Sequence, residues 1–93
     1  MSDDIVGVEI ALQEYLGSKF DGSAVGTVDI QGRLALMPYG NQTLEFWLFH
    51  MENSVQANGG QWRVVGHGTV EQIQQLMKSV GVPQSVRRAW GYD

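Results

Sequence analysis

The chain has 93 residues, a length that supports one hydrophobic core but not two, so we expect residues 1–93 to form a single compact domain. Hydrophobic residues make up 43% and charged residues 17%, as in ordinary globular proteins, and no apolar run approaches the roughly 18 residues that span a bilayer. The absence of cysteine excludes disulfides and every metal site that needs sulfur, and no cofactor is expected.

The net charge of −4 is unevenly distributed along the chain. Residues 1–62 contain eight acidic and two basic side chains, whereas residues 63–93 contain two acidic and four basic ones. An acidic body disfavours nucleic acid, because binding to phosphates requires a surface rich in lysine and arginine. A basic protein is the better expected partner. The first residues lack the basic and apolar regions of a secretory signal, so we expect a cytoplasmic location.

The first predicted element is a helix over residues 4–16. Apolar residues recur along it at helical spacing, and Gly17 follows where a glycine commonly ends a helix. The apolar positions expected to face the core are Ile5, Val8, Leu12, Tyr15 and Leu16. Two extended runs, 25–30 and 33–37, then flank the dipeptide Gln31-Gly32, which predicts a β-hairpin.

A third strand is predicted over residues 43–51, the most apolar segment of the chain. The dipeptide Asn58-Gly59 follows it, and this pair is a strong signal for a two-residue hairpin turn. A fourth strand is therefore expected over residues 60–65.

The C-terminal part of the chain has the signals of a helix and a short helical turn. Thr69 and Gln72 have the spacing of a capping box, so a second helix should begin at residue 70 and end at Gly81. Residues 84–90 are expected to form a last turn that packs apolar side chains back on the body. The order α-β-β-β-β-α predicts an α+β fold: a four-stranded antiparallel sheet with the N-terminal and C-terminal helices packed on one face.

The third strand carries large apolar side chains on both of its faces. If both helices cover one face, the other face stays open, and exposed aromatic patches commonly mark protein interfaces. The predicted interface consists of Glu45, Trp47, Phe49 and Met51. A protein partner or a second copy of the chain, forming a homodimer, would cover it. The alternative is that loops and the C-terminal segment cover this face within one chain.

The two histidines provide a candidate metal site. A regular turn at Asn58-Gly59 would place His50 opposite His67, with Glu52 on the same face and diagonal to His67. Two imidazoles and a carboxylate on one face can bind zinc or ferrous iron. The alternative is that these are ordinary histidines at a strand end.

Two further patterns suggest anions or DNA as ligands. Gly66, Gly68 and Thr69 lead into the second helix, whose free N–H groups could bind a phosphate, although the same residues suit a tight turn and a helix cap. Arg87 and Arg88 lie on the would-be recognition helix of a short helix-turn-helix pattern, although the acidic body opposes DNA binding.

No recognisable catalytic constellation is present, so the expected function is not enzymatic. The sequence favours a small acidic protein-binding module of the inhibitor, immunity or adaptor type, acting through a sheet face and its acidic surface. The first alternative is a domain that binds a metal or small ligand through His50, Glu52 and His67. The second is DNA binding through the C-terminal helical segment.

Overall fold

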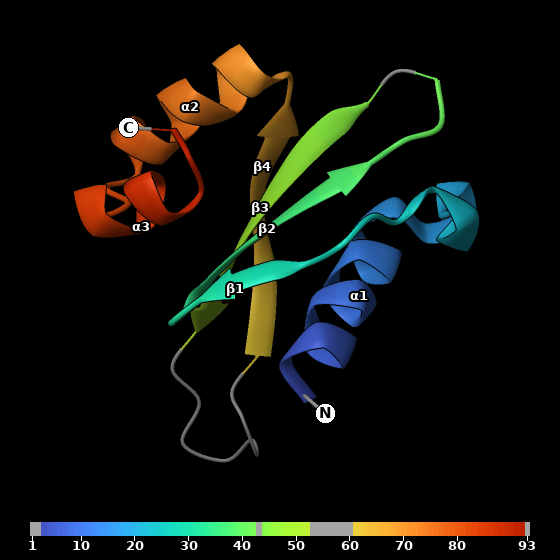
Figure 1. The fold of residues 1–93 in the computed structure, drawn as a ribbon. Helices are drawn as coiled ribbons and strands as arrows, with labels where there is room; N and C mark the ends of the chain where they lie inside the picture. Colours follow the sequence, from blue (N-terminus) through green and yellow to red (C-terminus); the bar gives the residue numbers. More distant parts are fainter. Residues whose placement is uncertain (1–2, 43, 53–60, 93) are drawn as a thin grey trace.

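A computed structural model describes residues 3–42, 44–52 and 61–92 of the chain (Figure 1). It contains three α-helices and one four-stranded antiparallel sheet, which confirms the α+β class. The elements are α1 (Asp3–Leu16), the short 3-10 turns η1 (Gly17–Lys19) and η2 (Gly22–Ala24), β1 (Asp29–Gln31), β2 (Leu34–Tyr39), β3 (Glu45–Glu52), β4 (Gln61–Gly68), α2 (Val70–Ser79) and α3 (Gln84–Ala89).

The strands pair in chain order, β1-β2-β3-β4, and each is antiparallel to the next. Gln31 pairs with Leu34, so the first hairpin turns at Gly32 and Arg33, one residue later than predicted. Gly32 has a φ of 63°, a left-handed conformation that explains the glycine. The first strand is also shorter than predicted, because Val25 makes only an isolated bridge to Tyr39. The predicted turn at Asn58-Gly59 lies outside the described residues.

The helices lie on opposite faces of the sheet, with α1 on one side and α2 and α3 on the other (Figure 1). The prediction that they share one face is wrong. Side chains alternate along β3, so Trp47 and Phe49 pack in the core under α1, whereas Leu48 packs in the core under α2. A sheet that is apolar on both faces must be shielded from water on both. Here α1 covers one face, and α2 and α3 cover the other.

The first core joins α1 to the sheet. Val8, Ala11 and Leu12 are buried against the aromatic side chains of the sheet. Gly7 lies against the ring of Trp62 so closely that a Cβ atom there would be 2.7 Å from its Cδ1. The buried side of α1 is therefore centred on positions 7, 8, 11 and 12. Ile5 and Tyr15, both predicted to face the core, are 41% and 58% exposed.

The second core joins α2 and α3 to the other face of the sheet. Ile73 and Met77 from α2 pack with Leu36 and Leu48, and the last turn contributes partly buried side chains. Val86 and Trp90 are among these, which confirms the prediction that the C-terminal turn packs on the body. None of the helices in the described part of the chain is long and apolar enough to cross a membrane.

Candidate functional site

The predicted interface on the sheet does not exist as an open surface. Trp47 is 3% exposed and Phe49 is fully buried, both beneath α1. Met51 is partly buried against the same core. The prediction that Trp47 and Phe49 meet a partner is therefore wrong, because the chain itself covers this face with one of its two helical layers. Glu45, at the start of β3, is the member of the predicted interface with a solvent-accessible carboxylate.

The predicted metal site is not assembled either. His67 pairs with Trp47, whereas His50 pairs with Arg63, four residues earlier than the predicted partner. A register shift at Leu48 and Phe49 lies between these two pairs. His67 stacks on Trp47 on the α1 face, while His50 borders Val65 and Val82 on the opposite face. No group of three histidine, aspartate or glutamate residues within the described ranges could hold a metal ion.

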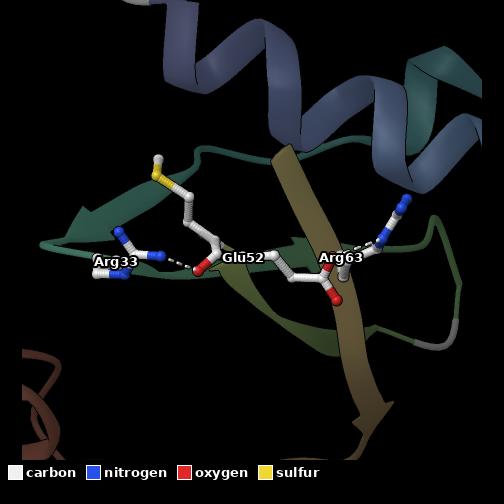
Figure 2. Close-up of polar contacts among 4 residues, drawn as sticks. Arg33, Glu52 and Arg63 are labelled. Carbon is white, nitrogen blue, oxygen red and sulfur yellow. Dashed lines mark hydrogen bonds and ion pairs between the residues drawn. The ribbon is translucent and has the colours of Figure 1, made fainter. Parts of the chain in front are cut away.

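Glu52, the third member of that proposed site, has another partner. Its carboxylate lies 3.4 Å from Nε of Arg63, and both side chains are roughly half exposed. Figure 2 shows this pair beside Arg33, whose guanidinium donates a hydrogen bond of 2.7 Å to the carbonyl of Met51. These contacts link the start of β2 to the end of β3, and the end of β3 to β4. The Glu52–Arg63 pair is exposed, so it adds little stability.

The residues of the predicted anion site cap α2 or pack against it. Thr69 caps the helix: its hydroxyl accepts from the backbone N–H of Gln72, and the Gln72 side chain accepts from the Thr69 N–H. The capping box is thus confirmed. Gly66 and Gly68 belong to β4, where added Cβ atoms would lie 2.5 Å from the side chains of Leu76 and Gln72. Close packing of α2 on β4 accounts for both glycines.

The arginines of the proposed DNA-binding segment lie on α3, a helix of six residues. Nε of Arg87 donates to the carbonyl oxygen of Val82 at 3.3 Å, so this side chain is held against the turn that precedes α3. Arg88 is exposed. DNA binding through this segment stays a prediction.

Four aromatic rings gather where the end of α1 meets the sheet. Trp47 and His67 are stacked with ring centroids 4.2 Å apart, as expected for directly opposed strand residues. Tyr15 from α1 and Tyr39 from β2 approach Trp47 edge-on, at 5.3 Å and 6.0 Å. We call these four rings, together with Glu45, the aromatic cluster.

The carboxylate of Glu45 is held beside these rings by His67. Oε1 of Glu45 lies 2.8 Å from Nδ1 of His67, and the two side chains are 39% and 37% exposed. Glu45 is two residues from Trp47, the strand partner of His67, and so it occupies the diagonal position that was predicted for Glu52. The prediction that Glu52 lies diagonal to His67 is wrong, because the register places Glu45 there.

A hollow of about 330 Å³ opens beside the aromatic cluster. Its lining also includes Leu16 and Gly40. Tyr39 is fixed in it, because its hydroxyl accepts a hydrogen bond of 3.0 Å from the backbone N–H of Asp21. Hydrogen bonds from the side chain and backbone of Ser23 hold the pKa of Asp21 below its ordinary value, so its carboxylate stays charged in this turn.

The chemistry of this hollow suits a cation. Aromatic faces are negative, and a carboxylate at the edge adds a full charge. The lining contains no lysine or arginine that would repel a cation and no serine or cysteine nucleophile. The sequence pattern does not predict this site, because its members are distant in the chain; Glu45 and Trp47 belong to the predicted interface and His67 to the predicted metal site.

Comparison with known proteins identifies no relative: no protein family, curated protein or solved structure matches this chain.

Proposed function

We propose that the protein is a small acidic binding module that receives a basic side chain of a partner protein in the hollow beside the aromatic cluster. The observation that carries the proposal is the combination of aromatic rings and one carboxylate, Glu45, around a hollow of about 330 Å³. A cation over an aromatic ring gains about 0.5–1 kcal/mol at an exposed site and about 2 kcal/mol when desolvated.

The accessibility of the rings supports this assignment. Tyr15 is 58% exposed, so its ring is available to a ligand without rearrangement of the core. Trp47 is almost fully buried and serves as a rigid floor that positions Tyr15, Tyr39 and His67 around it. A preorganised site of this kind loses little conformational entropy when it binds.

The charge of the whole chain supports a protein partner with a basic surface. Ten acidic residues stand against six basic ones. Eight of the acids lie in residues 1–62, the part of the chain that supplies Tyr15, Tyr39, Glu45 and Trp47. Complementary charge speeds association and suppresses wrong partners. Inhibitor, immunity and adaptor roles fit such a module, without catalysis and in the cytoplasm, and these finer assignments remain predictions.

The test compares two small probes that differ in charge. We expect N-acetyl-argininamide at millimolar concentration to shift the NMR signals of Tyr15, Trp47 and His67 in a saturable way. The isosteric N-acetyl-citrullinamide should not, because it lacks the positive charge. The variant Glu45→Gln should weaken arginine binding at least about fivefold, a loss of about 1 kcal/mol.

The matched control is Glu52→Gln, which removes the same charge from the other end of β3. It should change arginine binding less than about twofold, because only long-range attraction is lost. Equal binding of arginine and citrulline, or equal losses in the two variants, would overturn the proposal.

A further inference from the structure

A second cavity lies on the opposite face of the sheet from the aromatic cluster, between the strands and the turn that joins α2 to α3. Its volume is about 300 Å³, at the lower end of the range for small-molecule sites. The strands contribute Leu34, His50 and Val65, and the turn contributes Val80, Gly81 and Val82. The site therefore has apolar walls from two separate parts of the fold.

His50 is the one polar side chain in this lining. It is half-buried, and its imidazole makes no hydrogen bond or ion pair with any other residue in the described part of the chain. The carboxylate of Glu52, two residues from His50, forms an ion pair with Arg63. An imidazole among valines and a leucine offers one specific polar contact to a ligand that is otherwise apolar.

Two arginine side chains donate hydrogen bonds to backbone carbonyls in or next to the lining. Arg87 donates through Nε to the carbonyl oxygen of Val82, which is one of the lining residues. Arg33 precedes Leu34, and its guanidinium is bound to the carbonyl of Met51, the residue after His50 (Figure 2). These cations favour an anionic polar group on the ligand, in contrast to the acidic aromatic cluster on the other face.

From these contacts we infer that this cavity binds a small apolar carboxylic acid, with its hydrocarbon tail between Val65, Val80 and Val82 and its carboxylate at the imidazole of His50. The inference is independent of the proposed function, since the two sites share no lining residue. A carboxylate accepts a hydrogen bond from either ring nitrogen that carries a proton, so it satisfies the free donor of His50.

The experiment uses octanoate as the probe and octan-1-ol as its uncharged counterpart. Octanoate should shift the methyl signals of Val65, Val80 and Val82 and the imidazole signals of His50 in one saturable set. Octan-1-ol should bind at least about fivefold more weakly. His50→Leu should weaken octanoate about tenfold and leave octan-1-ol unchanged within a factor of two, because the variant keeps the apolar volume.

Val80→Asp supplies a second variant; we expect it to fold, because Val80 is 50% exposed. Its charge at the rim should weaken octanoate at least about fivefold, while the isosteric Val80→Thr should have less than a twofold effect. Non-saturating shifts, shifts centred on Trp47 instead of His50, or an unchanged octanoate affinity in His50→Leu would overturn the inference. None of these readouts depends on binding of a cation at Glu45.

Discussion

Gly7 shows how one residue without a side chain sets the distance between α1 and the sheet. A Cβ atom at this position would be 2.7 Å from Cδ1 of Trp62, whose side chain is itself 4% exposed. In a helix free of such a contact, alanine stabilises by about 1 kcal/mol relative to glycine. Here the steric cost should exceed that gain.

We therefore expect Gly7→Ala to lower the free energy of unfolding by about 1–3 kcal/mol, measured by urea denaturation. Gln13→Ala on the exposed side of the same helix is the control and should change stability by less than about 0.5 kcal/mol. A more stable Gly7→Ala protein would show that α1 does not pack on Trp62 as described.

Thr69 governs the start of α2 through two reciprocal hydrogen bonds with Gln72. Thr69→Ala removes the hydroxyl acceptor and should lower the free energy of unfolding by about 1 kcal/mol. Thr69→Ser keeps the oxygen and should retain most of the stability. Thermal or urea unfolding of the three proteins measures this difference, and an alanine variant as stable as the wild type would contradict the assignment of the cap.

At the scale of elements, the pairing of β3 with β4 decides which side chains meet. The structure pairs Trp47 with His67 and His50 with Arg63, and it puts the two histidines on opposite faces. Nuclear Overhauser effects should therefore connect the side chains of Trp47 and His67, and separately those of His50 and Arg63. Contacts between the imidazoles of His50 and His67 would instead restore the regular hairpin register and its metal site.

Features determined by a few neighbouring residues were predictable from the sequence. The capping box at Thr69 and the helix end at Gly17, which has a φ of 59°, depend on contacts within one helical turn. Long-range features were not predictable. Alternation along β3 indicates that both faces are apolar, but it carries no information on which helix covers which face.

The position of the candidate site shows the same limit. Glu45 and His67 are 22 residues apart, and their hydrogen bond depends on the β3-β4 register. That register could not be derived from the Asn58-Gly59 signal, because an irregularity at Leu48 and Phe49 shifts the pairing within the ladder. Tyr15 reaches the site only because α1 lies on the same face as Trp47, the arrangement that the sequence pattern did not predict.

For the whole molecule, the two helical layers leave no large sheet face for a dimer to cover in the described part of the chain. Trp47→Glu tests this arrangement. A carboxylate in a site that is 3% exposed costs several kcal/mol, enough to unfold a small domain. We expect loss of the folded circular dichroism spectrum.

Leu44→Glu is the control for this substitution, because Leu44 is 52% exposed and precedes the same strand. It should stay folded with nearly unchanged stability. If Trp47→Glu instead gave a folded monomer from a wild-type dimer, Trp47 would lie in an interface between chains, as the sequence pattern alone had suggested.

The central claim, that the aromatic cluster receives a basic side chain, is tested most directly by locating a bound arginine at atomic resolution. Intermolecular nuclear Overhauser effects should connect the δ-methylene protons of N-acetyl-argininamide with the ring protons of Tyr15 and Tyr39. These two rings line the hollow beside Glu45. Effects confined to other surfaces, or none at probe concentrations that saturate the chemical shifts, would contradict the account.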